Sequence, residues 1–185
     1  MAARNARIGA MKNINLRAAE PRDVPAIVGL ITELAEFEQL SHLLDLSAQT
    51  LHPHLFGPQP VVECVVAAPL AGADQSTSGA PGLVGFALFF TNFSTFLARP
   101  GLYLEDLYVQ PAWRGKGVGK ALLQHLGALA VARDYGRFEW SVLDWNERAI
   151  GFYEKMGATV MDEWRICRVA GPALARFERP ADLPD

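Results

Sequence analysis

Three glycines, Gly115, Gly117 and Gly119, lie in a basic segment that leads directly into an apolar helical pattern. Glycine has no Cβ, so main chain at these positions can approach a ligand closely. A helix that begins there presents unpaired N–H groups and the positive end of its dipole. This arrangement indicates an anion site, most often one for phosphate. A plain strand-to-helix turn is the simpler interpretation, but it requires fewer glycines.

Two common phosphate-binding loops fit this segment poorly. A Walker A loop needs GxxxxGK followed by Ser or Thr, but Arg114 stands five residues before Gly119 and no hydroxyl residue follows Lys120. A dinucleotide fingerprint GxGxxG starting at Gly115 requires glycine at 120, with Asp144 as its acidic partner. The first loop is excluded, and the second stays as an alternative.

Strands and helices expected around the glycine segment form a mixed α/β pattern. Alternation and β-rich composition predict strands at 13–19, 61–68, 82–90, 102–109 and 138–144, and a last strand or strand pair from Thr159. Helical spacing predicts helices after Pro21, from Ser47, after the glycines, and from Asn146 as N-cap to Gly157. A loop rich in Gly, Ser and Pro separates the second and third strands at 69–81.

Composition limits the class of protein. The 185 residues, 50% hydrophobic, fit one domain, which we place at 14–171 between tails 1–13 and 172–185. A formal net charge of −3 argues against a nucleic-acid binder. The longest apolar run begins at Leu83 and is too short to span a membrane, and 1–13 lacks a secretory apolar run. We expect a cytoplasmic protein without membrane or nucleic-acid partners, whose start is Met1 or Met11.

The pattern Arg114-x-x-Gly117-x-Gly119, after a strand and before a helix, resembles the acetyl-CoA pyrophosphate loop of the GCN5-related N-acetyltransferase (GNAT) family. From Ile14 to Val169, about five-sixths of the chain, the element order follows that family. ELAEFE (33–38), LYLEDLYV (102–109) and VLDWNERAIGFYEKMGA (142–158) are similar to its diamine acetyltransferase branch, which includes the thialysine and spermidine/spermine enzymes. The resemblance implies a mixed central sheet with helices on both faces, acetyl-CoA as co-substrate, and a homodimer.

The resemblance also implies two catalytic roles. Acetyl transfer requires a neutral amine, and an alkylamine with a pKa of about 10.4 is protonated at neutral pH. Glu105 matches the base that removes this proton through water, and Tyr153 matches the acid that protonates the departing thiolate. Without the resemblance, Glu105 is an exposed strand carboxylate, and Tyr153 is one aromatic of an apolar helix stripe. Asp106 is then an ordinary paired residue.

Two sets of binding residues follow from the same resemblance. Expected acetyl-CoA contacts are Leu107, Tyr108, Val109, Arg114, Gly115, Lys116, Gly117, Val118, Gly119, Lys120, Asn146, Ala149 and Lys155. Expected amine contacts are Phe37, Glu38, Thr95, Glu139, Trp140, Ser141, Asp162 and Trp164. The four histidines lack the companions of a metal or nucleophilic site, so we expect no metal.

These residues together predict an acetyl-CoA-dependent N-acetyltransferase that acts on a small amine. Thialysine or a short diamine is expected to be preferred over spermine, because Ser94 and Thr95 stand where the spermidine/spermine enzymes carry an aspartate, and Arg99 adds a cation. Two alternatives stay open. One is acetylation of a protein N-terminus or lysine, and the other is a non-catalytic acyl-CoA sensor, which would not need Glu105 or Tyr153.

Overall fold

The structure is a computed structural model that describes residues 13–70 and 82–177. Its contacts divide the chain into two compact units, Met1–Ser141 and Val142–Asp185. The loop expected at 69–81 falls almost entirely outside the described residues, as do both candidate start methionines and most of the two expected tails.

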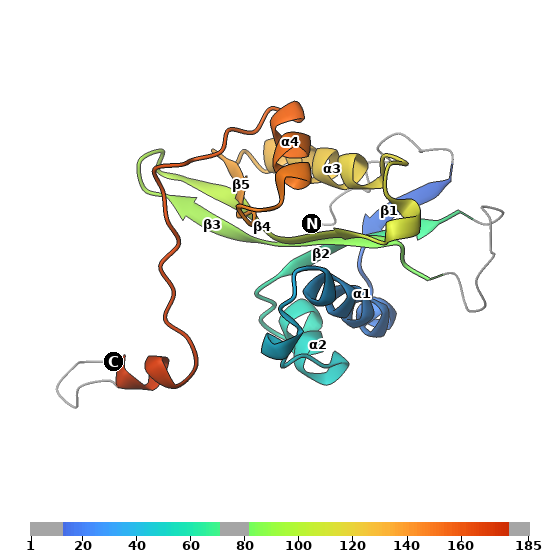
Figure 1. The fold of residues 1–185 in the computed structure, drawn as a ribbon, viewed down its shortest axis with the longest axis horizontal. Coiled ribbons are helices and arrows are strands. Elements are labelled where there is room, and N and C mark those ends of the chain that lie inside the picture. The colour runs from blue at the N-terminus through green and yellow to red at the C-terminus, as the bar shows by residue number, and fades with distance from the viewer. Residues whose placement is uncertain (1–12, 71–81, 178–185) are drawn as a thin grey trace. The chain divides into compact units, whose positions relative to one another are not determined.

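The first unit is built on a five-stranded sheet in the order β1-β2-β3-β4-β5 (Figure 1). The strands are β1 (Ile14–Ala18), β2 (Glu63–Pro69), β3 (Gly85–Ser94), β4 (Arg99–Val109) and β5 (Phe138–Trp140). The first four are antiparallel neighbours, whereas β5 runs parallel to β4. Parallel neighbours need a crossover connection, and helix α3 (Val118–Ala132) supplies it.

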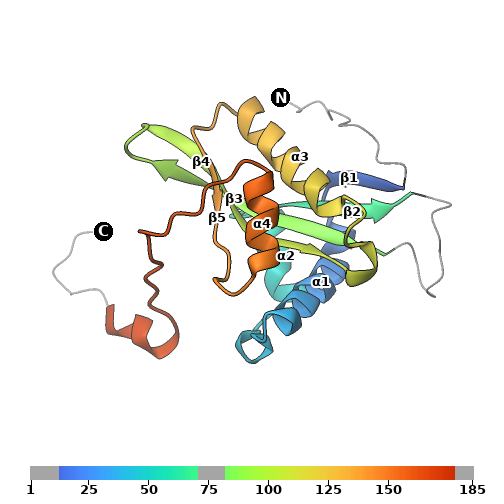
Figure 2. The same ribbon diagram turned by 45° about the horizontal axis from the view of Figure 1, so that its top comes forward.

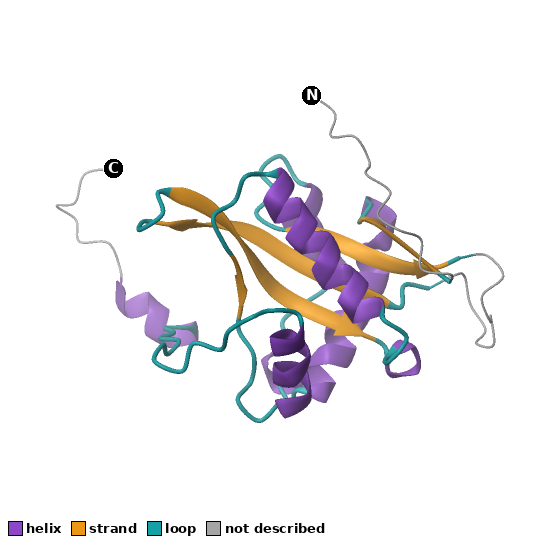
Figure 3. Ribbon diagram, turned by 90° about the horizontal axis from the view of Figure 1, so that it is seen from above, coloured by secondary structure: helices purple, strands orange, loops and turns teal. Residues whose placement is uncertain are grey.

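Helices cover both faces of this sheet. Helices α1 (Val24–Phe37) and α2 (Ala48–Phe56) lie on one face and α3 on the other (Figures 1 and 3). Cys64 and Val66 of β2 pack in one apolar cluster with residues of α1 and α2. Val65 and Ala67, which alternate with them along the strand, are also buried. A strand buried on both faces reads as a continuous apolar run, as this one does. The predicted mixed sheet with helices on both faces is confirmed.

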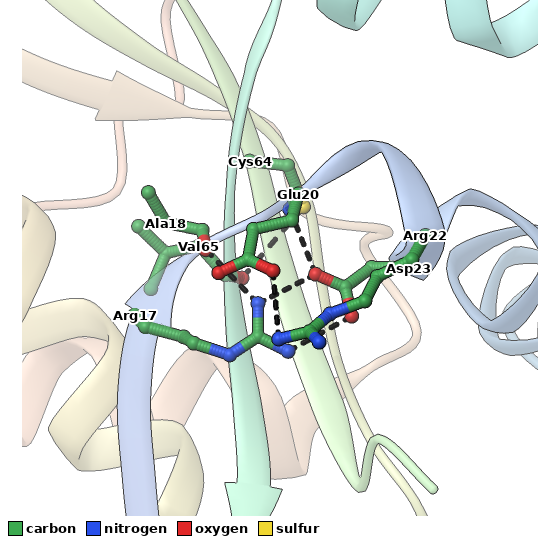
Figure 4. Close-up of polar contacts among 7 residues, drawn as sticks. All are labelled: Arg17, Ala18, Glu20, Arg22, Asp23, Cys64 and Val65. Atoms are coloured by element: carbon green, nitrogen blue, oxygen red, sulfur yellow. Dashed lines mark hydrogen bonds and ion pairs between the residues drawn. The ribbon is translucent and has the colours of Figure 1, made fainter.

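An ion pair fixes the start of α1 against the sheet. Asp23 is buried, and its Oδ2 and Oδ1 atoms accept hydrogen bonds from the Arg17 guanidinium at 2.5 and 2.8 Å (Figure 4). The backbone N–H of Glu20 also donates to Asp23 Oδ2, at 2.7 Å. These bonds, that of Arg17 first, lower the pKa of Asp23. Loss of Arg17 would leave a buried carboxylate without its cation, a costly defect.

Short 3₁₀ helices precede or follow several of these elements. They are η1 (Pro21–Asp23), η2 (Ser41–Leu43), η3 (Pro111–Trp113) and η4 (Gly171–Phe177). The predicted start of α2 at Ser47 is confirmed, because the Ser47 hydroxyl accepts from the Thr50 N–H at 3.1 Å. Among the described residues, no helix is long and apolar enough to cross a membrane.

The second unit contains α4 (Glu147–Lys155). Asn146 caps it as predicted, since its Oδ1 accepts from the Ala149 N–H at 3.2 Å. Gly157 follows the helix with a φ of +95°, the left-handed conformation expected at that position.

Two predicted strands differ from the structure. The strand expected over 138–144 ends at Trp140, and the strand or strand pair expected from Thr159 is wrong. Residues 158–170 form turns and irregular backbone and are almost all exposed. A strand requires a partner for its backbone hydrogen bonds, and the described part of the second unit contains no other strand.

Candidate active site

A β-bulge interrupts β4 at Glu105. Leu88 of β3 pairs with Asp106, but the next residue, Phe89, pairs with Leu104, so Glu105 is the extra residue on β4. Bulges redirect side chains and are common beside active sites. In a regular strand, adjacent side chains point to opposite faces. Because the bulge breaks this alternation, the carboxylates of Glu105 and Asp106 can interact with each other.

Asp106 lies in an acidic environment. Burial raises the pKa of Asp106 to about 6, and the charges of Glu105 and Glu38 contribute to the same shift. Burial also raises the pKa of Glu38, which follows the last residue of α1. The alternative that Asp106 is an ordinary paired residue is not supported, because no ion pair joins it to another described residue. Two carboxylates that both act on a third favour a cation such as an alkylammonium.

One edge of β4 is open beside the bulge. Within the described sheet, β5 pairs only with Leu102–Leu104, so residues 105–109 have no strand on that side. The Gln110 N–H donates to the Val84 carbonyl, so the backbone groups of Gln110 face β3. Antiparallel strands turn alternate residues toward the partner. The backbone groups of Leu107 and Val109 therefore face the open edge, and those of Tyr108 face β3.

The glycine turn joins this edge to α3, and two of its glycines have a conformational cause. Gly115 and Gly117 have φ values of +74° and +85°, which favour glycine, and Gly117 is the N-cap of α3. Gly119 differs, because an added Cβ would meet only Val109 Cγ2 at an ordinary 3.7 Å. Glycine inside a helix costs about 1 kcal/mol relative to alanine. The structure of the chain therefore does not require Gly119, which points to a ligand that needs the space.

The other residues of the turn are of two kinds: some are packed against the protein, and two lysines are exposed to solvent. Val118 is buried and anchors the first turn of α3, which leaves its backbone N–H at the helix end. Lys116 and Lys120 are exposed, and Lys116 Nζ lies 5.1 Å from the centre of the Trp113 ring. Arg114 is instead turned back, with its Nε donating to the Val109 carbonyl at 2.9 Å.

Several expected amine contacts gather around the bulge. Phe37 ends α1 and Glu38 follows it, on the same acidic side as Asp106. Trp140 pairs in register with Leu104, the residue before the bulge, so Trp140 and Ser141 are the β5-side residues nearest to Glu105. The Ser141 hydroxyl lies 2.8 Å from that of Tyr103. The structure thus brings Phe37, Glu38, Trp140 and Ser141 toward one part of β4.

Two other expected amine contacts are placed differently. Glu139 accepts a hydrogen bond from Asn92 Nδ2 at 2.8 Å and pairs with Arg137 at 3.1 Å, so its charge is already balanced. Thr95 is exposed at the tip of the β3–β4 hairpin (Figure 2). Arg99, at the base of the tip, lies six positions before Glu105 along β4, which is roughly 20 Å of extended chain. The structure therefore does not bring Thr95 to Glu105.

The other expected site residues belong to the second unit. Tyr153 and Lys155 lie in the last part of α4, where the Tyr153 and Phe152 ring centres are 5.3 Å apart. Asp162 and Trp164 are exposed in the irregular segment that follows α4. The roles of Tyr153, Asn146, Ala149 and Lys155 stay predictions.

The sequence also carries a signal for the special position of Asp106. Glu105 and Asp106 are adjacent charges inside a strand that is otherwise apolar, and a strand buried on both faces has no solvated face for the second charge. Such a doublet is compatible with a bulge, because a bulge breaks the alternation. Among the residues that the structure describes, no group of three or more His, Cys, Asp or Glu side chains is arranged to hold a metal ion.

Comparisons with known proteins agree with this geometry. Residues 37–158 match the family model described as Acetyltransferase (GNAT) family. The chain is 36% identical to L-ornithine N5-acetyltransferase NATA1 of Arabidopsis thaliana, over 89% of this chain and 87% of that protein. It is 34% identical to thialysine N-epsilon-acetyltransferase of Mus musculus, over 89% and 96% of the two chains.

Among solved structures, an integron cassette protein from V. cholerae superimposes with a TM-score of 0.69. That match covers 88% of this chain and 96% of the other at 24% sequence identity. At this identity the similarity supports the fold alone.

Proposed function

Because this chain belongs to the acetyltransferase (GNAT) family, we propose that it moves the acetyl group of acetyl-CoA to the primary amine of thialysine or a short diamine. The observation that carries the proposal is the bulge at Glu105. Glu105 belongs to an acidic cluster with Asp106 and Glu38, and it stands at one end of an open strand edge that continues into the glycine turn. The predictions of the family, its diamine branch and an acetyltransferase activity are confirmed by the family match and the named relatives.

The acetyl donor fits the open edge and the turn. The backbone of Leu107 and the N–H of Val109 can pair with the amide groups of a pantetheine arm as an additional strand would. The N-terminus of α3 and the exposed Lys116 and Lys120 offer positive charge to the pyrophosphate. Gly119 leaves room for the phosphates to approach the backbone.

The amine fits the acidic side of the bulge. Glu38, Asp106 and Glu105 attract an ammonium group, and the ring of Phe37 offers apolar contact to its carbon chain. At pH 7 roughly one alkylamine molecule in 2,500 is neutral, because its pKa is about 10.4. Removal of a proton from the bound ammonium is therefore part of the reaction, and we assign it to Glu105 acting through water.

Acetyl transfer then proceeds by direct attack. The amine nitrogen forms a bond to the thioester carbonyl carbon, and a tetrahedral oxyanion results. The oxyanion collapses with cleavage of the C–S bond, and Tyr153 protonates the departing CoA thiolate. Two protons leave the amine nitrogen in total: the first passes through water to Glu105 before the attack, and the second passes to solvent from the cationic nitrogen of the tetrahedral intermediate. Tyr153 gives one proton to sulfur, and both residues recover their original states by exchange with solvent.

The preference for a short amine rests on the relatives and on the acidic cluster. The Arabidopsis and mouse relatives are named for ornithine and thialysine, both of which carry a single side-chain amine. The cation of Arg99 is paired with Asp134 at the hairpin, remote from Glu105 along β4. Arg99 therefore does not support the preference that the sequence led us to expect.

A panel of amines tests the proposal by release of free CoA thiol. Thialysine, ornithine, a short diamine, spermine and a peptide are compared at equal concentration with acetyl-CoA. We expect kcat/KM for thialysine or the short diamine to exceed that for spermine by about 10-fold. Acetylation of the peptide alone would support a protein acetyltransferase instead. Binding of acetyl-CoA without turnover of any acceptor would support a sensor.

We also propose that the protein is a homodimer. The exposed segment after α4 carries large apolar side chains that a monomer leaves in water, with Trp164 69% and Ile166 68% exposed. Exposed apolar clusters of this kind mark protein interfaces, and a second copy is the partner that the diamine branch implies.

A further inference from the structure

We propose that Arg114 is a positioning residue that joins the acetyl-donor edge of β4 to the end of α1, rather than a ligand of the CoA pyrophosphate. This inference rests on the proposed function, because it concerns the site of the acetyl donor. The position of Arg114 at the start of the glycine pattern suggests that its side chain binds phosphate. In the structure, however, the side chain contacts β4 and the end of α1.

The guanidinium of Arg114 is held on three sides. Its Nε donates to the Val109 carbonyl at 2.9 Å. Its central carbon lies 4.9 Å from the centre of the Phe37 ring and 5.4 Å from that of the Tyr108 ring. Arginine stacks on aromatic rings through its flat, delocalised cation, an interaction that strengthens when water is excluded. The side chain thus contacts α1 and β4 at once.

A second set of hydrogen bonds holds the aromatic side of this arrangement. The Tyr108 hydroxyl donates to Glu33 Oε2 at 3.1 Å, and Gln110 Nε2 donates to Glu33 Oε1 at 3.0 Å. Glu33 lies on α1, one helical turn before Phe37. Through Glu33, helix α1 therefore holds Tyr108 and Gln110 at the end of β4, and α1 also carries Phe37. Arg114 stacks on the rings of Tyr108 and Phe37, so both elements fix its position.

The bond to Val109 has a consequence for the donor. Val109 is one of the two residues whose backbone faces the open edge, and its carbonyl is occupied by Arg114. Arg114 thereby sets the direction of this carbonyl and the path of the chain into the glycine turn. Its loss should disturb the edge that receives the pantetheine arm, which is common to acetyl-CoA and to acetyl-pantetheine, a donor without pyrophosphate.

The test compares these two donors with one fixed amine. For Arg114→Leu we expect kcat/KM to fall roughly 10-fold or more for both acetyl-CoA and acetyl-pantetheine, so that their ratio stays unchanged. Lys116→Gln and Lys120→Gln serve as matched controls, and we expect them to lower kcat/KM for acetyl-CoA alone. The charge-retaining Arg114→Lys should not restore activity, since lysine lacks the flat stacking group. A loss confined to acetyl-CoA, or rescue by lysine, would overturn the inference.

A second measurement does not depend on catalysis. In the protein without ligand, Arg114→Leu and Phe37→Leu should each lower Tm, and the double variant should lower it by less than the sum of the two. Additive losses would mean that the two side chains do not act together, and would overturn the inference by themselves. If the unmodified protein acetylates no amine from either donor, the proposed function fails. The Tm comparison of the two single variants with the double variant still decides whether Arg114 has a positioning role.

Discussion

At the scale of single residues, the two adjacent carboxylates at the bulge, those of Glu105 and Asp106, differ in their exposure to solvent. Glu105 is exposed beside the open edge, whereas Asp106 is largely buried on the acidic side of the strand. An exposed carboxylate can exchange protons with water, as a base must in every turnover. A buried one is held near its neighbours and is better suited to attract a cation.

The role of Glu105 can be tested through the pH dependence of turnover. Glu105→Gln should reduce kcat/KM about 100-fold near pH 7, because the ammonium then has no base. Part of the activity should return as pH approaches the pKa of the free amine, where deprotonation no longer needs the enzyme. A pH-rate profile from pH 6 to 10 measures this. A loss that stays constant across the profile would show that Glu105 binds substrate without acting as base.

Tyr153 is tested by removal of its hydroxyl alone. Tyr153→Phe should lower kcat roughly 100-fold with little change in the affinity for acetyl-CoA, since a general acid acts on the leaving group. Phe152→Leu, which changes the neighbouring ring of α4, is the control for packing. Near-normal turnover of Tyr153→Phe would assign Tyr153 to the apolar stripe of the helix.

Asp106 predicts a pH-dependent stability. Its pKa is raised from its ordinary value to about 6, chiefly by burial. Below about pH 4 the group is protonated in both the folded and unfolded states, and the folded state carries no penalty. Between about pH 4 and pH 6 the group is ionised in the unfolded chain but still protonated in the folded protein, so stability falls over this range and the full penalty is reached above pH 6. Asp106→Asn should therefore stabilise the protein at pH 7.5 by on the order of 2 kcal/mol, with little effect at pH 4.

Urea unfolding at several pH values checks this expectation, with the exposed Asp45→Asn as the control for removal of a carboxylate. A destabilised Asp106→Asn at pH 7.5 would mean that the ionised carboxylate has a favourable partner. The same variant should weaken amine binding, because one of three attracting charges is gone.

At the scale of elements, α3 carries two glycines that differ in position. Gly119 is the second residue of the helix, at the end proposed to receive the pyrophosphate, and Gly127 lies in the third turn. An added Cβ meets nothing within 4 Å at Gly127 and one ordinary contact at Gly119. Helix propensity alone therefore favours alanine at both positions, by about 1 kcal/mol at the interior Gly127 and by less at Gly119 in the first turn.

The two alanine variants should separate stability from binding. Both Gly119→Ala and Gly127→Ala should raise Tm of the protein without ligand. Only Gly119→Ala should reduce the affinity for acetyl-CoA, which calorimetry measures directly. If both variants bind acetyl-CoA like the unmodified protein, the space at Gly119 does not serve the donor.

Local chemistry was sufficient for some elements and insufficient for others. The starts of α2 at Ser47 and of α4 at Asn146 were predictable because an N-cap is an interaction within four residues. The end of β5 at Trp140 was not, because a strand lasts only as long as its neighbour offers hydrogen bonds. The segment from Thr159 has strand-like composition, but composition alone supplies no partner strand.

At the scale of the whole molecule, the exposed apolar segment after α4 predicts association. Light scattering should give twice the chain mass for the unmodified protein at micromolar concentration. Trp164→Ser combined with Ile166→Ser should shift it toward the monomer, because apolar burial is the main source of interface stability. The control is Val131→Ser, which removes an exposed apolar side chain from α3 in the first unit. A monomeric unmodified protein would contradict the proposed homodimer.

The sequence by itself determined the fold class and the family, and it predicts an anion site at the glycine turn. Periodicity and helix caps indicate the fold class, and the Arg114-x-x-Gly117-x-Gly119 pattern carries the resemblance to the family; all of these are local in the chain. The single domain expected over 14–171 stays a prediction. Local signals sufficed here because hydrogen bonds within a turn and the period of apolar residues do not depend on distant segments.

Only the tertiary structure decided the bulge, the surroundings of Asp106 and the direction of Arg114. The bulge is defined by the register of β4 against β3. The pKa of Asp106 is raised in part by the charge of Glu38, which directly follows α1 and is far away in sequence. Arg114 turns toward Phe37 and Val109 because α1 packs beside the end of β4. Each of these depends on contacts between segments that meet only after folding, and no pattern within one segment contains that information.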